Sequence, residues 1–369
     1  MSKPLSEPSL RDVASIGLLS AAYPLATVEA VVDAAGVREE RNRKLPAQLM
    51  VMFSLGMWLW PEAGYVAVLR ALQSGLYWAR GVPSLPELPS DGSITNARKR
   101  VGHEPLKALL ATARGSEAAG DDPRASFAGL RRVAFDEMVL DAPSSPENGA
   151  VFGTPPKLRA AMLAECGTLS LLGAEVEGAA EVTSPALLER LLAAGTVDER
   201  TLLVADFPGG TGLSPMLWPA ARATGAELLW RVPPSAPLPC RTVLPDGTYL
   251  SELAWPGSDR GIEVRVVEYR LDGACGDYYP VRLVTSLVDP ERADAAGLAA
   301  CHADRWTAGE VGRVVRLRPS TSGTALRSKS AGTALAEAWA LLCVYQAMRK
   351  LVRPAPAVGR DHVRISTIG

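Results

Sequence analysis

The spacing of apolar and polar positions predicts helices in the first third of the chain. Residues 1–44 are polar and charged apart from Ile16–Val32, which predicts one or two helices. Leu45–Pro61 is uncharged, but it contains Gln48 and stops short of the length that a bilayer requires, so a buried helix is the better interpretation. Gly64–Ala79 has apolar residues at helical spacing and predicts a second packed helix.

From Phe127 onwards, short runs typical of strands alternate with helical patterns. This alternation predicts an α/β core. The expected strands are Arg131–Asp141, Arg159–Cys166, Leu169–Val176, Thr201–Asp206 and Glu227–Val232. The expected helices between them are Pro185–Ala194 and Pro215–Thr224.

After Val232 the pattern becomes rich in proline and in alternating runs, which predicts a β-rich insertion. Its clearest strands are Glu263–Arg270 and Tyr279–Ser286. Helical patterns return before a tail at residues 353–369. The expected late elements are helices Glu291–Ala303, Arg305–Arg318 and Thr333–Val352, with Pro319–Ser330 as a loop.

The composition describes a chain long enough for two or three domains, with 369 residues of which 47% are hydrophobic. The net charge of −1 and a pI near 6.4 argue against an overall basic protein, so any phosphate-binding surface has to be local. Five scattered cysteines without a CxxC pair or a signal peptide favour free thiols in a reducing cytoplasm. The three distant histidines disfavour zinc, which leaves a hard cation held by carboxylates.

A basic helix follows the proline-rich turn at Val82–Pro89. Ser90 or Ser93 is expected to cap it, and it carries three adjacent cations at residues 98–100. Following another helix, it has the pattern of a helix-turn-helix element aimed at phosphates, although a solvated helix face gives the same pattern. Gly115–Pro123 is expected to be a linker.

Three acidic residues stand in contexts that call for compensation. Asp136 lies inside the apolar run Arg131–Asp141, where a carboxylate costs desolvation energy unless it is paired or binds a metal. Asp206 ends a buried strand before a glycine-rich turn, and Glu310 lies among arginines on a late helix. Asp141 and Glu137 are expected on the opposite face of the strand from Asp136.

Eight phrases in one order, from about residue 15 to residue 352, resemble the IS4-type insertion-sequence transposases, which belong to the RNase H-like DDE enzymes. The phrases are LPAQLMVMFSLGMWLWPEAGYVAVLRAL (45–72), SITNARKRVGHEPLKAL (93–109), VAFDEMVLDAP (133–143), LLVADFPG (202–209), GAELLWRV (225–232), LPDGTYLSEL (244–253), LVDPERADAAGLAACHADRW (287–306) and LRSKS (326–330).

This resemblance implies an RNase H-like α/β core with a β-rich insertion, preceded by an all-helical N-terminal domain. The implied parts are a DNA-binding domain at residues 1–120, the first part of the core at 127–235, the insertion at 236–290 and the C-terminal core helices at 291–352. It also implies double-stranded DNA as partner, both element ends and target, with a homodimer on DNA and no membrane.

The resemblance further implies a catalytic triad of Asp136, Asp206 and Glu310 that holds two Mg²⁺ (or Mn²⁺) ions and cuts and joins DNA strands. Asp136 would bridge both ions. The expected DNA-binding residues are Arg98, Lys99, Arg100, Arg305, Arg313, Arg316, Arg327 and Lys329.

The flanking residues depart from the family pattern. Asp-Gly-Thr is replaced by Asp136-Glu137-Met138, and Asp-Arg-Gly-Phe by Asp206-Phe207-Pro208-Gly209. His302 and Leu317 stand at the signature Tyr and Lys positions. Three hypotheses follow: an active transposase, a domesticated descendant with another nuclease or catalytic role, or a non-catalytic DNA-binding or interaction protein in which each acid pairs with an arginine such as Arg305 or Arg313.

Overall fold

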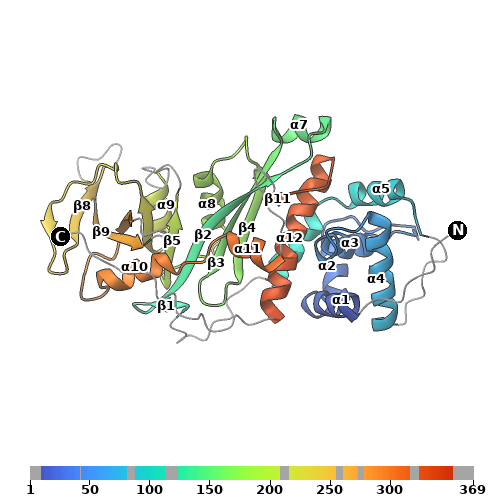
Figure 1. Ribbon diagram of the computed structural model, residues 1–369, viewed down its shortest axis with the longest axis horizontal. Helices are drawn as coiled ribbons and strands as arrows, with labels where there is room; N and C mark the ends of the chain where they lie inside the picture. Colours follow the sequence, from blue (N-terminus) through green and yellow to red (C-terminus); the bar gives the residue numbers. More distant parts are fainter. Residues whose placement is uncertain are drawn as a thin grey trace.

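The structure is a computed structural model of mixed α/β architecture. It describes residues 10–41, 43–80, 88–113, 124–207, 216–254, 261–272, 278–315 and 324–351. The described strands form one 11-stranded sheet. The molecule is elongated, with helix α12 (Ala331–Leu351) between the sheet and the N-terminal helices (Figure 1).

The N-terminal part is helical, as the apolar spacing predicts. Its helices are α1 (Leu10–Ala22), α2 (Leu25–Ala34), α3 (Ala47–Leu59), α4 (Tyr65–Arg80), α5 (Asp91–Val101) and α6 (Glu104–Ala113). α3 is buried on nearly every side, which explains its uncharged sequence. Ser90 caps α5 by accepting a hydrogen bond from the Ser93 N–H at 3.3 Å.

α12 joins this helical part to the sheet. It packs against α3 and α6 on one side and β4 (Leu171–Gly178) on the other. The Trp58 Nε1–H donates to the Glu337 carbonyl oxygen at 2.7 Å, and the Tyr23 hydroxyl donates to the Cys343 carbonyl oxygen at 2.9 Å. One continuous hydrophobic core therefore runs from the N-terminal helices through α12 to one face of the sheet.

The sheet has the order β4-β3-β2-β5-β6-β10-β9-β8-β7. β2 pairs in parallel with β5 and β5 with β6, whereas β3 pairs antiparallel with both β2 and β4. The central strands are β2 (Leu130–Asp141), β3 (Lys157–Glu165), β5 (Thr201–Asp206) and β6 (Glu227–Val232). Helices α8 (Ser184–Ala193) and α9 (Leu217–Ala223) make the connections that the sequence predicts.

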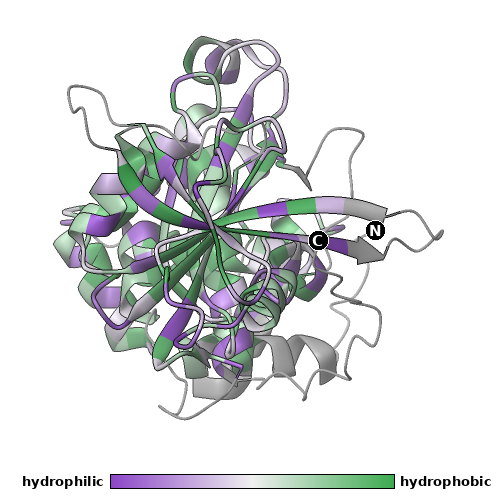
Figure 2. Ribbon diagram, turned by 90° about the vertical axis from the view of Figure 1, so that its left-hand side faces the viewer, coloured by the Kyte–Doolittle hydropathy of each residue, from purple (hydrophilic) through white to green (hydrophobic). Residues whose placement is uncertain are grey.

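The strand-rich region after Val232 continues this sheet. β10 pairs antiparallel with β6, with Thr285 opposite Leu229, so β6 is not an edge strand. Viewed from the β8 end along the long axis, hydrophobic segments crowd the centre of the molecule (Figure 2). The strands of this region are β7 (Thr242–Val243), β8 (Tyr249–Leu253), β9 (Ile262–Asp272) and β10 (Tyr278–Thr285).

Three short elements were not predicted from the pattern. β1 (Ser126–Phe127) and β11 (Thr324–Ala325) both pair with β2, the latter within a stretch expected to be a loop, and α7 (Pro146–Phe152) lies between β2 and β3. Asp294 caps α10 (Ala295–Ala303) and sets its first turn later than the pattern predicts. In the described part of the chain, the next helix is α11 (Gly309–Val315).

Among the described residues, no single helix is long and apolar enough to cross a membrane. One bent pair, Ile16–Ala22 with Leu25–Ala34, meets that test by length and composition. Ile16, Leu19, Val28 and Val32 of this pair are buried in the shared core. The predicted linker Gly115–Pro123 and the tail at residues 353–369 lie outside the described residues.

Candidate functional site

Asp136 and Asp206 lie side by side on neighbouring parallel strands. Phe135 of β2 pairs with Ala205 of β5, so the two aspartates occupy the next position on each strand. The side chains of Phe135 and Ala205 are buried in the core on one face. Because successive side chains alternate between faces, both aspartates point to the opposite face, on the side of α10 and α11.

Glu137 lies on the face opposite to Asp136, as expected. It forms an ion pair with Arg159 of β3, and Arg159 also donates to the Ser184 hydroxyl at the start of α8. Asp141 lies 3.8 Å from the Lys157 amine. Both acids are therefore compensated away from the Asp136–Asp206 pair.

The connection between α10 and α11, residues 304–308, covers the two aspartates. The Arg305 Nη2–H donates to Asp206 Oδ2 at 2.8 Å, and the Ala308 N–H donates to Asp136 Oδ2 at 2.9 Å. Trp306 between them is 1% exposed, and its Nε1–H donates to the Tyr345 hydroxyl of α12 at 2.9 Å. A buried tryptophan thus holds this connection against both the sheet and α12.

The two aspartates have different electrostatic environments. Burial raises the pKa of the Asp136 carboxyl, and neighbouring Asp206 raises it further, whereas the N–H groups of Ala308 and Glu137 and the charge of Arg305 oppose the rise. Asp206 instead contacts two guanidinium groups, Arg305 and, at 3.2 Å, Arg231 of β6. Asp136 is compensated mainly by backbone dipoles, and Asp206 by full positive charges.

Glu310 is the second residue of α11, two positions after Ala308. Its carboxylate forms ion pairs with Arg313 on the same helix and with Arg349 of α12, the latter at 3.4 Å. Arg349 is largely buried, whereas Arg313 is mostly exposed. Glu310 therefore lies on the segment that covers the aspartates, but its carboxylate is held by arginines.

Carboxylate oxygens are the ligands that Mg²⁺ and Mn²⁺ prefer in proteins, and Asp136 and Asp206 present theirs from adjacent strands. The complete triad does not fit in this arrangement. Across the part of the chain that the structure describes, no three His, Cys, Asp or Glu side chains are grouped to hold a metal. The structure brings Asp136 and Asp206 together and leaves the Glu310 carboxylate outside their group.

His302 supports the arginine at this site. It is 2% exposed, its Nδ1 lies 2.8 Å from the Tyr269 hydroxyl, and its carbonyl oxygen accepts from Arg305 at 3.0 Å. Burial, together with the charges of Arg305 and Arg231, lowers the pKa of His302 well below its usual value. The imidazole is therefore neutral at physiological pH.

Sequence reasoning did not single out Arg231, Tyr269 or Arg349. A usable signal existed for Arg231, because it stands opposite Asp206 in the β5–β6 register. Arg349 approaches Glu310 only through the packing of α11 on α12, and no local pattern in the sequence marks that contact.

The basic residues predicted to bind DNA are mostly engaged within the protein. Arg98 is 3% exposed, and its guanidinium donates to the Tyr65 hydroxyl, the Ser328 hydroxyl and the Thr333 carbonyl oxygen. The three adjacent cations of α5 therefore do not share one solvated face. Arg98 points inwards because it falls on the same side of the helix as Ile94 and Val101.

The remaining predicted cations divide into engaged and open groups. Lys99 pairs with Glu147 at 2.9 Å, Arg100 with Glu39 at 2.6 Å, and Arg327 donates to backbone carbonyls at the end of α3 and the turn that follows. Lys329 is exposed. Arg316, and Leu317 at the signature Lys position, lie outside the described residues.

The comparisons with known proteins point to transposases. Residues 13–111 match the family described as the insertion element 4 transposase N-terminal region. The transposase InsG for insertion sequence element IS4 of Escherichia coli (strain K12) is 24% identical over 329 residues, which cover 84% of this chain and 70% of InsG. These two matches confirm the resemblance of this chain to the IS4-type transposases.

A solved structure, the piggyBac transposase synaptic complex with hairpin DNA, is similar at a TM-score of 0.45 and 9% identity. The likeness covers 94% of this chain and 76% of that one. Similarity of this degree carries no weight for the site.

Proposed function

We propose that this protein is a DDE-type DNA transposase in which Asp136, Asp206 and Glu310 are the acidic residues of the active site. The observation that carries the proposal is the in-register pair Asp136–Asp206 beneath a connection that delivers Arg305. The strand order β4-β3-β2-β5-β6, with β2, β5 and β6 parallel, supports an RNase H-like core. The InsG match supports DNA as the substrate.

In this proposal Asp136 and Asp206 hold a divalent cation, Mg²⁺ or Mn²⁺, from the same face of the sheet. When bound, such ions supply charge neutralisation and activate a water or a 3′-hydroxyl at the phosphorus. The protein's own groups prepare the site: the Ala308 N–H orients Asp136, and Trp306 fixes the connection that carries Arg305. For Glu310 to join the site, its carboxylate would have to separate from Arg349 and Arg313.

The proposal extends to double-stranded element ends and target DNA as partners, a homodimer on that DNA and a cytoplasmic location. It also includes the division into an N-terminal DNA-binding domain and a core with its insertion. In the described residues, the N-terminal helices and the sheet share one hydrophobic core along α12.

A second candidate function rests on the arginines. Asp206 and Glu310 each contact two guanidinium groups, so their charges are compensated without metal. That arrangement favours a domesticated protein that binds DNA and no longer cleaves it.

The decisive experiment is strand cleavage of a duplex that carries the gene's own flanking sequence, with and without Mg²⁺. We expect the parent to cleave only with Mg²⁺, and Asp136→Asn to lose activity by about 100-fold or more, since it removes a charged ligand at nearly constant volume. Glu137→Gln is the matched control, because it removes a neighbouring carboxylate on the opposite face.

A thermal melt gives a second readout. Mg²⁺ should raise the melting temperature of the parent and not that of Asp136→Asn. A parent that binds the duplex, shows no Mg²⁺ shift and cuts nothing would contradict the catalytic proposal in favour of the non-catalytic one.

A further inference from the structure

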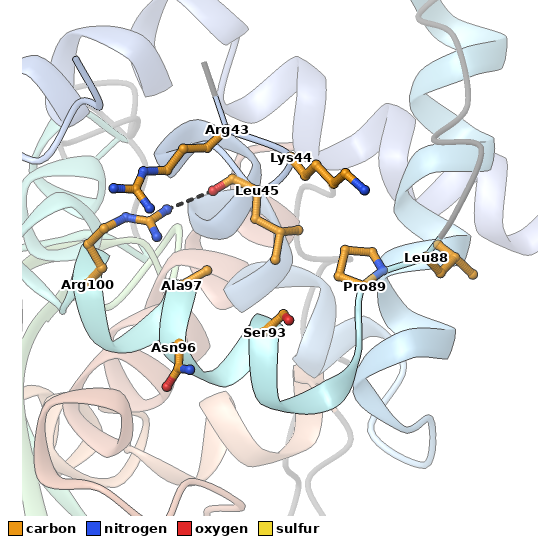
Figure 3. A pocket seen from close by; sticks show the side chains of 9 residues that line it. All are labelled: Arg43, Lys44, Leu45, Leu88, Pro89, Ser93, Asn96, Ala97 and Arg100. Atoms are coloured by element: carbon orange, nitrogen blue, oxygen red, sulfur yellow. Dashed lines mark hydrogen bonds between the residues drawn. The ribbon is translucent and has the colours of Figure 1, made fainter. Parts of the chain in front are cut away.

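A hollow in the N-terminal helical part collects positive charge. Its walls come from the segment before α3 and from α5, and it encloses about 480 Å³ (Figure 3). We call it the basic hollow. It is lined by Arg43, Lys44, Leu45, Leu88, Pro89, Ser93, Asn96, Ala97 and Arg100.

Two of the three cations of the basic hollow have no counter-charge among the described residues. Arg43 and Lys44 are exposed and, among the described residues, form no ion pair or side-chain hydrogen bond. Arg100 lines the same hollow (Figure 3). Like charges around one hollow repel, so a bound anion would stabilise this arrangement.

Arg100 is the fixed element of this group. It donates to the Leu45 carbonyl oxygen at 2.8 Å and pairs with Glu39, whose side chain is 8% exposed. These contacts hold the segment that carries Arg43 and Lys44 against α5. Glu39 offsets one of the three cations, which leaves a local excess of two positive charges.

The rest of the lining suits a sugar-phosphate chain. Ser93, Asn96 and Arg100 follow one another at intervals of three and four residues, so they form the exposed face of α5, while Ile94, Arg98 and Val101 form its buried face. Ser93 and Asn96 bring side-chain hydrogen-bond donors, and Leu88 and Pro89 an apolar edge. Hydroxyl, amide and cationic donors are the groups that contact phosphates in protein–DNA complexes.

We propose that the basic hollow binds phosphates of the duplex DNA backbone, with Arg43 and Lys44 as the contacting cations and Arg100 as the residue that positions them. The inference rests on the proposed function, in that it takes DNA as the partner. It moves the N-terminal contact from Arg98, which is buried, to the segment before α3.

The test measures binding of a fluorescently labelled mixed-sequence duplex by anisotropy over a range of salt concentrations. The double variant Arg43→Gln with Lys44→Gln should weaken binding about tenfold or more and lower the slope of log affinity against log salt by about two. Asn96→Asp leaves every cation in place and adds a carboxylate to the hollow, so it should also weaken binding.

The matched control removes two exposed cations outside the hollow, by Arg70→Gln with Arg200→Gln. Both double variants change the net charge of the protein equally. If only the overall charge mattered, both would lower the affinity for DNA and its salt slope by the same amount. All four positions tested by charge removal are exposed, and melting temperatures should stay close to that of the parent.

The outcomes separate the two proposals. A parent that fails to bind the duplex would overturn the proposed function and this inference with it. A parent that binds DNA while the hollow variants match the control in affinity and salt slope would overturn the inference alone.

Discussion

The acid-bearing face under the α10–α11 connection and the basic hollow beside α5 differ in how far their charges are compensated within the protein. At the first, Asp206 and Glu310 each meet two arginines, and Asp136 meets two backbone N–H groups. At the second, Arg43 and Lys44 face solvent without a described partner. The charges of the first region are compensated by groups of the protein itself, whereas two charges of the second region are available to a ligand.

The net charge of −1 does not show this difference, because it is a sum over charges that are paired within the protein and charges that are not. α5 itself places arginines in two different settings within three residues: Arg98 is buried in the fold, and Arg100 lines the hollow. Position on the helix, and not the presence of positive charge, decides which role an arginine takes.

Removal of Arg98 should give the largest loss of stability. Arg98→Met keeps much of the apolar stem but leaves the Ser328 hydroxyl and the Thr333 carbonyl oxygen without this donor. We expect the free energy of unfolding to fall by about 3 kcal/mol in denaturant titrations. The dependence of DNA affinity on salt should be the same for Arg98→Met as for the parent. A lower slope in the variant would mean that Arg98 contacts DNA.

Asp206→Asn should give the next largest loss of stability. The change leaves Arg305 and Arg231 facing each other without an anion, so we expect a loss of about 2 kcal/mol in the same titration. Asp136→Asn, which removes no direct arginine contact, should cost less. Equal losses for the two variants would mean that their environments do not differ as the contacts indicate.

The smallest effect is a pH dependence carried by Asp136. Because its pKa in the fold is raised above the ordinary 3.8, the native state holds this proton more tightly than the unfolded chain does. The charged carboxylate therefore costs stability near neutral pH, and this cost disappears as the pH falls through the folded pKa towards 3.8.

Unfolding free energies of the parent and Asp136→Asn, measured from pH 7 to pH 4, check this sign. The parent should gain stability relative to the variant on acidification. A relative loss on acidification would mean that the Ala308 and Glu137 N–H groups outweigh burial and lower the pKa.

The local pattern of the sequence was sufficient for most elements. β5 and β6 begin and end where the apolar runs do, because each run is bounded by turn-forming residues that end a strand. The Ser90 cap of α5 was likewise readable, since a side-chain oxygen before a helix satisfies its first N–H groups. The face of Asp136, opposite to Glu137, followed from strand alternation.

The tertiary structure alone decided which charges meet. Arg98 reaches Ser328, Arg305 reaches Asp206 and Arg349 reaches Glu310 across long separations in sequence. β11 pairs with the end of β2 that extends beyond its pairing with β5. Local periodicity gives the direction of a side chain relative to its own helix or strand. It carries no information on what another element brings to that side, so the fate of an acid or an arginine depends on packing.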